Sequence, residues 1–276
     1  FDGSSIRGFQ KIQESDMLLK PDPTTAFIDP MFEVPTLVMI CDVADPVLKG
    51  PYSRDPRFIA KKAEAYLRQT GVADTCYFGP ELEFFIFDSI RFEQNQHCGY
   101  YYLDSVEGRW NSGREENPNL GYKPRYKEGY FPVPPLDKQQ DIRDEMVREM
   151  QAAGIAVERQ HHEVATAGQC EIDMYRDELV TMADSTMTYK FVTKNVASKM
   201  GLIASTMPKP IFGDNAVGMH VHSSLWKSGK NAFFDPNDRL HLSKAAKHFT
   251  AGLLKHIPEI TLVLNQWVNS YKRLVP

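Results

Sequence analysis

The segment His161–Asp173 constrains the fold and the chemistry of this chain more than any other. It reads HHEVATAGQCEID, so acids and histidines flank a run of small residues that lacks the hydrophobic periodicity of a core element. Ala165, Ala167 and Gly168 let the backbone approach a ligand closely, which a solvated loop does not require. A polar surface loop is the alternative interpretation. We predict that the segment is a ligand loop.

Two other segments carry side chains of the same kind. A strand predicted over 75–88 places Glu81 and Glu83 on one face, and a strand predicted over 217–226 does the same for His220 and His222. Desolvated carboxylates are costly unless they are paired or bound to a cation. Each pair also has an ordinary interpretation, a solvated strand face for the acids and satisfied core imidazoles for the histidines.

The kinds of ligand predict the metal. Glu81, Glu83, Glu163 and Glu171 form an oxygen-rich set with few imidazoles, which suits Mg²⁺ or Mn²⁺ better than zinc or copper. Such ions neutralise nucleotide phosphates, so the set predicts ATP-dependent chemistry. The sequence contains neither a Gly-x-x-x-x-Gly-Lys-Ser/Thr loop nor a dinucleotide fingerprint. We therefore expect the nucleotide to be held in another way.

Composition excludes several classes of protein. The net charge of −4, without a long basic tract, argues against nucleic-acid binding. No apolar run approaches the ~20 residues of a membrane-spanning helix. The 4 cysteines show no Cys-x-x-Cys spacing, which is typical of reduced thiols in a cytoplasmic protein. Because the chain begins at Phe1 without a methionine, we expect it to be a piece of a longer protein.

Local patterns predict helices between strands. Helices are expected at 54–70, 137–154, 178–200 and 243–257, strands at 75–88, 156–160 and 217–226, and a long loop with one hairpin over 93–135. Asp137 is predicted to cap its helix, and Pro258 to end the last one. The inward face of the first helix is predicted to carry Ile59, Ala63, Tyr66 and Leu67.

Motifs along the whole chain resemble those of the type I glutamine synthetases. They are Phe1-Asp2-Gly3-Ser4-Ser5 with Glu14-Ser15-Asp16, Phe78-Gly79-Pro80-Glu81-Leu82-Glu83-Phe84-Phe85, Gly129-Tyr130-Phe131, His161–Glu171, Met207-Pro208-Lys209-Pro210, Gly218-Met219-His220-Val221-His222 and Asn269-Ser270-Tyr271-Lys272-Arg273. The resemblance implies an α+β fold, in which an antiparallel β-sheet catalytic domain has flanking helices, as in the glutamine synthetase and guanido kinase group. It also implies that residues 1–52 end a β-grasp region and linker, and that residues 53–276 form a catalytic domain incomplete at its C-terminus.

The resemblance also implies roles for individual residues. Two metal ions would be held, one by Glu83, Glu163 and Glu171, and one by Glu81 and His220. The nucleotide contacts would be Glu158, His222 and Ser224. Glutamate would contact Asn215, Ala216 and Arg273, and ammonium would lie by Asp2 and Tyr130, which makes Asp2, Tyr130 and Arg273 the expected catalytic residues.

The implied reaction is ATP-dependent ligation of ammonia to L-glutamate through γ-glutamyl phosphate, with Mg²⁺ or Mn²⁺. The implied protein is a cytoplasmic homo-oligomer, a dodecamer with active sites between subunits, without nucleic-acid or membrane partners. The family's flap glutamate, its last metal ligand and several arginines correspond to positions beyond Pro276. We therefore expect the isolated 276 residues to have little or no activity.

Two segments depart from the family pattern. Asn215-Ala216-Val217-Gly218 replaces Asn-Gly-Ser-Gly, which predicts a narrowed glutamate pocket, and Asn265-Gln266-Trp267-Val268 replaces a proline-containing segment. Two other functions remain open on the sequence. One is a γ-glutamyl-amine or polyamine ligase of the same superfamily, and the other is a non-catalytic structural homologue.

Overall fold

The computed structural model describes residues 1–111 and 121–275. Its helices are α1 (Pro56–Thr70), α2 (Gln140–Ala152), α3 (Leu179–Lys199), α4 (Lys244–Lys255), α5 (Ile257–Leu264) and α6 (Val268–Arg273), with 3-10 turns at Gly3–Ser5, Ile12–Glu14 and Pro23–Thr25. Its strands are β1 (Leu18–Pro21), β2 (Phe27–Ile28), β3 (Leu37–Val38), β4 (Cys41–Ala44), β5 (Thr75–Phe87), β6 (Ser89–Gln94), β7 (Gly99–Asp104), β8 (Val157–His162), β9 (Gln169–Met174), β10 (Asp177–Glu178), β11 (Ile203–Ser205), β12 (Met219–Lys227) and β13 (Lys230–Asn231).

Contacts group these residues into two compact units. The first unit holds residues 1–78, 176–188 and 223–249, and the second holds 79–175, 189–222 and 250–276. Every metal ligand predicted from the sequence belongs to the second unit, whereas Asp2 and Ser224 belong to the first.

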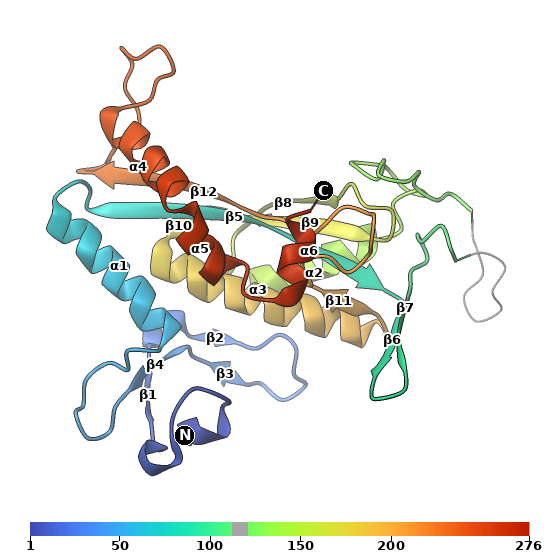
Figure 1. The fold of residues 1–276 in the computed structure, drawn as a ribbon, viewed down its shortest axis with the longest axis horizontal. Coiled ribbons are helices and arrows are strands. Elements are labelled where there is room, and N and C mark those ends of the chain that lie inside the picture. The colour runs from blue at the N-terminus through green and yellow to red at the C-terminus, as the bar shows by residue number, and fades with distance from the viewer. Residues whose placement is uncertain (112–120, 276) are drawn as a thin grey trace. The chain divides into compact units, whose positions relative to one another are not determined.

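The antiparallel sheet of the second unit is built on β5, the long cyan strand of Figure 1. β9 pairs with β5, β8 pairs with β9, and β11 pairs with the last residues of β5. From Leu82 to Phe87 side chains on both faces of β5 are buried, because neighbouring strands and helices cover the strand on both sides. The hairpin of β6 and β7 continues from the end of β5 (Figure 1).

Helices cover one face of this sheet. The buried residues of α2 include Ile142, Met146 and Met150, and α2 packs against β8 and β9. On α3, Tyr189 is fully buried, and its hydroxyl donates a hydrogen bond of 3.0 Å to the Leu82 carbonyl of β5. Burial of such side chains drives the packing, at roughly 25 cal/mol per Å² of apolar surface.

The first unit is organised around a buried arginine of α1. The Arg57 guanidinium donates to the carboxylates of Asp22, Asp42 and Asp184 at 2.6, 2.6 and 3.0 Å. Asp55 caps the helix by accepting from the Arg57 amide, and Gly71 ends it at φ 68°. These bonds tie α1 to the segment after β1, to β4 and to α3.

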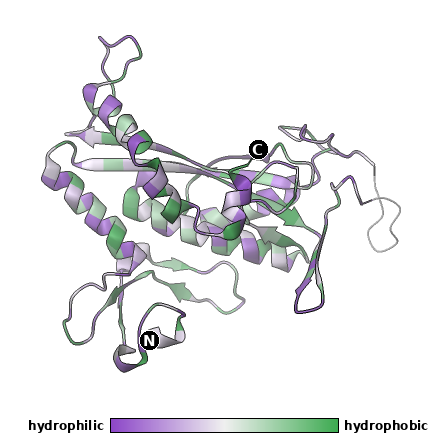
Figure 2. Cartoon of the chain, in the orientation of Figure 1, coloured by the Kyte–Doolittle hydropathy of each residue, from purple (hydrophilic) through white to green (hydrophobic). Residues whose placement is uncertain are grey.

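Several predicted elements differ from the observed ones. The face predicted to be inward on α1 is exposed at Ile59 and Tyr66, because α1 packs through its arginine rather than through an apolar stripe; Figure 2 shows hydrophilic and hydrophobic residues mixed along this helix. The helix predicted at 243–257 ends at Lys255, before Pro258 as predicted, but Pro258 then lies in the first turn of a further helix, α5. The predicted Asp137 cap is also wrong, because the N-cap of α2 is Gln139.

The prediction of a long loop over 93–135 is partly confirmed. The β6–β7 hairpin occupies its first part, and residues 112–120 of this segment lie outside the described residues. Among the described residues, no helix is both long enough and apolar enough to span a membrane.

We expect Arg57→Met to lower the free energy of unfolding by about 3 kcal/mol, because it leaves partly buried carboxylates without a counter-charge. The matched control is Arg68→Met on the same helix, whose exposed pair with Glu64 spans 3.6 Å and contributes at most about 0.5 kcal/mol. Urea unfolding of both variants tests this. Equal losses would show that Arg57 stabilises the unit only through its aliphatic stem.

Candidate metal centre

Three carboxylates from different parts of the sequence meet in the second unit. Glu83 lies on β5, Glu171 lies on β9, and Glu163 follows the end of β8. Each places an oxygen within 4.8 Å of the other two, and the three residues are only 8%, 5% and 9% exposed. The structure thus brings together the three residues that the sequence predicted as one metal site.

The register of the strands brings these carboxylates together. Glu83 and Glu171 are direct partners in the β5–β9 ladder, and His161 is the partner of Glu171 on β8. Directly opposed residues project to the same face of a sheet, so the two carboxylates must face each other across the ladder. The tight turn at 163–168 then returns Glu163 to the same face, and Gly168 makes the turn at φ 77°.

Glu83 is held by neutral donors. Its Oε2 accepts from the Gln169 side-chain amide at 2.6 Å and from the Gly218 backbone amide at 2.8 Å. A Cβ on Gly218 would lie 2.6 Å from Glu83 Oε1, so only glycine fits this close approach. The two amides orient the carboxylate without neutralising its charge.

The electrostatics of the three carboxylates are unfavourable without a cation. Burial, with the Glu163 charge adding to it, raises the pKa of Glu83. Burial and the neighbouring Asp173 carboxylate raise the pKa of Glu171 to about 9. Carboxylate oxygens are the ligands that Mg²⁺ and Mn²⁺ prefer. The donor set therefore fits a hard divalent cation, which would remove the cost of placing these charges together.

A second group lies beside the first on the same strand. Glu81 accepts from His222 Nε2 at 2.8 Å and lies 3.3 Å from His220 Nδ1. Both imidazoles are exposed, whereas Glu81 is about three-quarters buried. The geometry brings together the two residues predicted to hold a second metal ion, and adds His222 to them.

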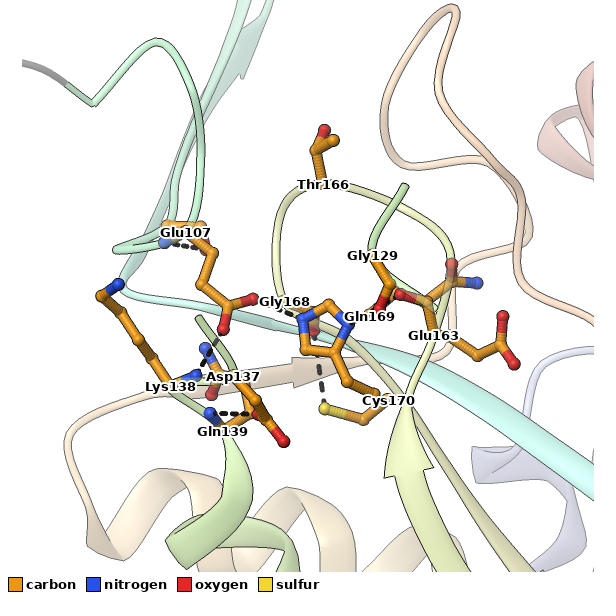
Figure 3. Close-up of polar contacts among 12 residues, drawn as sticks. Glu107, Gly129, Asp137, Lys138, Gln139, Glu163, Thr166, Gly168, Gln169 and Cys170 are labelled. Atoms are coloured by element: carbon orange, nitrogen blue, oxygen red, sulfur yellow. Dashed lines mark hydrogen bonds and ion pairs between the residues drawn. The ribbon is translucent and has the colours of Figure 1, made fainter. Parts of the chain in front are cut away.

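The buried imidazole of His162 supports the ligand loop. The Glu107 carboxylate lies 2.6 Å from Nε2 of His162, and the Gly129 carbonyl lies 2.7 Å from Nδ1. Figure 3 shows Glu107, Gly129 and Glu163 around this part of the site. The Glu163 carbonyl is also 2.7 Å from Nδ1. Burial lowers the pKa of His162, but the Glu107 carboxylate outweighs burial and the net shift is upward. His162 thereby fixes the backbone at Glu163.

Glu107, Asp137 and His162 also group their polar atoms, but they do not fit a cation. The Arg143 guanidinium already donates to both Asp137 oxygens, at 3.1 and 2.5 Å, and it is almost fully buried. A positive charge thus occupies the place that an ion would take. This ion pair also explains why Asp137 does not cap α2.

A bulge in β8 brings Glu158 beside Arg159. The register steps from Val157 opposite Met174 to Arg159 opposite Asp173, so Glu158 is the extra residue. Arg159 Nε donates to Asp173 Oδ2 at 2.6 Å, and Arg159 Nη2 lies 4.0 Å from Glu158. The hydrogen bond to Asp173 raises the pKa of Arg159, with Glu158 and Glu81 contributing.

The residues predicted to contact glutamate lie next to the three-carboxylate cluster. The Ala216 carbonyl accepts from Gln169 at 3.0 Å, and Arg273 Nε donates to the Val217 carbonyl at 2.7 Å. Asn215 Oδ1 is buried without a hydrogen-bond partner in the described residues. The side chain of Val217 packs with Phe85 and the loop alanines, so its bulk fills a core cluster.

The remaining predicted residues have separate settings. Tyr130 is exposed and contacts the His161 ring edge-on, with ring centroids 5.6 Å apart. In the first unit, Asp2 caps the turn at Gly3–Ser5 by accepting from Ser4, and Ser224 accepts from Trp226 at 3.0 Å.

Several residues of this site carry no signal in the sequence that we recognised. Glu107 lies in a segment predicted to be a loop, and Arg143 and Asp173 become partners of the site only through strand pairing and helix packing. Gln169 and Asp173 both lie inside the segment predicted as a ligand loop, but their individual roles depend on contacts that the sequence does not show.

Family models match nearly the whole chain. The glutamine synthetase catalytic domain matches residues 53–276, and the glutamine synthetase beta-Grasp domain matches residues 1–46. The chain belongs to the glutamine synthetase family. The glutamine synthetases of Frankia alni and Microchaete diplosiphon are 57% and 56% identical to it, over 100% of this chain and 58% of each relative. The chain thus spans less than two thirds of the length of these relatives.

Solved structures agree with this membership. Plasmodium falciparum glutamine synthetase superposes with a TM-score of 0.91 at 33% identity, over 100% of this chain and 54% of that one. GmaS without ligand superposes with a TM-score of 0.78 at 26% identity, over 100% and 58%. These likenesses confirm the predicted α+β fold with an antiparallel sheet and flanking helices.

We expect Glu171→Gln to remove a pH dependence of stability in EDTA. The pKa of Glu171 is raised in the folded chain, so its contribution is fully present below about pH 4.5 and is lost as pH rises toward 9. At pH 8 the variant should exceed the wild type by on the order of 2 kcal/mol in urea unfolding. Added Mn²⁺ should stabilise the wild type and not the variant.

The matched control is Glu93→Gln, which removes an exposed carboxylate of β6 in the same unit. It should change neither the pH dependence nor the response to Mn²⁺. Parallel pH profiles for the wild type and Glu171→Gln would contradict the role of Glu171.

Proposed function

We propose that this chain forms the metal- and nucleotide-binding part of a ligase that joins ammonia to L-glutamate with ATP, through γ-glutamyl phosphate. The observation that carries the proposal is the buried cluster of Glu83, Glu163 and Glu171. Membership of the glutamine synthetase family supports the same reaction.

Mg²⁺ or Mn²⁺ would be held by Glu83, Glu163 and Glu171, and a second ion by Glu81 and His220. Divalent ions at such sites neutralise phosphate oxygens and stabilise charge on a phosphoryl group in transfer. The chain's own part is to fix the ligands, because Gln169 and Gly218 orient Glu83 and the His162 ring fixes the backbone of Glu163.

Glu158, His222 and Ser224 are the proposed nucleotide contacts. The bulge in β8 supports the role of Glu158, since it turns that side chain to lie beside Arg159. His222 is exposed and bonded to Glu81, so it can contact phosphate while remaining oriented.

Glutamate would bind at Asn215, Ala216 and Arg273. The unpartnered Asn215 oxygen is an acceptor suited to an ammonium group, and the Arg273 guanidinium is suited to a carboxylate. The Ala216 carbonyl accepts from the Gln169 amide, and the methyl group does not disturb this hydrogen bond. This argues against the non-catalytic interpretation drawn from the sequence.

Ammonium would bind at Asp2 and Tyr130. Hydrogen bonds from the Ser4 side chain and backbone lower the pKa of Asp2, so this carboxylate is ionised at neutral pH and attracts a cation. Tyr130 offers an exposed ring and hydroxyl. In the oligomer that we propose, a dodecamer in the cytoplasm, Asp2 would enter the site of a neighbouring subunit.

The division of the chain belongs to the same proposal. The two family matches end at residue 46 and begin at residue 53, which supports a boundary between a β-grasp region (1–52) and a catalytic domain (53–276).

We expect Asp2→Ala, in a protein containing these 276 residues, to slow glutamine formation by about 100-fold. Glutamate-dependent formation of ADP without ammonia should change much less, because Asp2 acts only on the ammonia step. Parallel assays of both products test this. Asp45→Ala is the control, since Asp45 makes the same kind of turn-capping bonds to Val47 and Leu48 outside the site.

Equal losses in both assays would remove Asp2 from the ammonia step. A panel of amine acceptors in the same assay tests the substrate. Preference for methylamine or a polyamine over ammonia would replace the proposed function with that of a γ-glutamyl-amine ligase.

A further inference from the structure

Arg159 and Asp173 form an ion pair in line with the second group of ligands. Asp173 is the ladder partner of Arg159 on one side and of Glu81 on the other. The three side chains therefore form a row across β8, β9 and β5. The neighbouring row, two residues along, is His161, Glu171 and Glu83.

The Arg159 side chain is held in position, but most of its guanidinium donors remain available. Only its Nε makes a hydrogen bond within the described residues, to Asp173 at 2.6 Å, and the side chain is 54% exposed. The Nη groups have no closer charged partner there than Glu158, at 4.0 Å from Nη2. An arginine held at Nε presents the outer edge of a planar fork, which matches two phosphate oxygens.

Asp173 holds the arginine through one oxygen of a buried carboxylate. It is 3% exposed, and its Oδ1 has no hydrogen-bond partner in the described residues. An ion pair with one buried partner is weak evidence for stability, because desolvation of the Asp173 carboxylate offsets much of the attraction. Its clearest effect is to fix the position of an exposed guanidinium.

We propose that Arg159 is a phosphate-binding residue for the nucleotide, beside Glu81 and His220, and that Asp173 is its positioning residue. This inference rests on the proposed function, since it names a further contact to the same nucleotide. Apart from Arg159, the row consists of the carboxylates of Asp173 and Glu81. These carboxylates would repel the phosphates of a nucleotide, so a fixed cation beside them is needed. The fork at the exposed end of the row supplies that cation.

The test is binding of nucleotides, by calorimetry in excess Mn²⁺, to a protein containing these 276 residues, with adenosine, AMP, ADP and inorganic phosphate as ligands. We expect Arg159→Gln to weaken ADP binding about tenfold and to leave adenosine binding unchanged. Arg159→Lys should recover less than half of the loss, because an ammonium lacks the fork. Asp173→Asn should weaken ADP binding about threefold, again without an effect on adenosine.

Arg148→Gln is the matched control, because Arg148 is an exposed arginine of α2 in the same unit, paired with Glu145. It should bind every ligand as the wild type does. A loss for adenosine equal to that for ADP would overturn the proposal in favour of a structural role. If Arg159→Gln weakens the binding of inorganic phosphate but not that of ADP, the proposal is also overturned, because the residue would then bind free phosphate rather than the nucleotide.

The outcomes separate this inference from the proposed function. If the wild type binds ADP and Arg159→Gln binds it equally well, only the role of Arg159 is overturned. If the wild type binds no nucleotide in Mn²⁺, the proposed function and this inference are both overturned.

Discussion

The structure depends on the repulsion among three buried carboxylates, Glu83, Glu163 and Glu171, whose oxygens lie within 4.8 Å of one another. Water cannot solvate them fully, because each residue is less than a tenth exposed. Protonation relieves part of the cost, as the raised pKa of Glu171 indicates. A divalent cation relieves all of it. The donor set therefore fits a divalent cation, and neighbouring residues hold the three carboxylates in position.

Two kinds of support maintain the cluster. Neutral donors, the Gln169 side chain and the Gly218 amide, hold Glu83 without satisfying its charge. The buried pair of Glu107 and His162 fixes the backbone carbonyl of Glu163 and so the position of that residue. An arginine or lysine side chain that neutralised the three carboxylates would occupy the place of a metal ion. Such a cation does occur nearby, where Arg143 is bonded to Asp137, and there the geometry leaves no room for an ion.

The alternation of side chains along a strand could be predicted from the sequence. Contacts between residues far apart in the sequence could not. Alternation along 75–88 correctly placed Glu81 and Glu83 on one face. The prediction of a loop over 161–173 was only partly right, because residues 163–168 form the turn while His161, His162 and Gln169–Asp173 are buried in the strands β8 and β9. The cap assigned to Asp137 failed because its carboxylate binds Arg143, four residues into α2. The inward face assigned to α1 failed because the helix packs through charged contacts.

The same limit applies to the site. Strand alternation gives no partner for a residue, so the alignment of Arg159, Asp173 and Glu81 depends on a ladder register that the sequence does not specify. The bulge at Glu158 shifts that register by one residue, which strict alternation cannot represent. The resemblance to a family supplied most ligands, and the structure supplied the contacts that hold them.

The central claim is that the carboxylate cluster is incomplete without a divalent cation and binds a proton in its place. Proton release on addition of Mn²⁺ to the metal-free chain, measured with a pH indicator in weak buffer, tests it most directly. The account predicts about one proton released per ion at pH 7, because the pKa of Glu171 is about 9 in the metal-free chain, and almost none at pH 10. Binding of Mn²⁺ without proton release at pH 7 would contradict it.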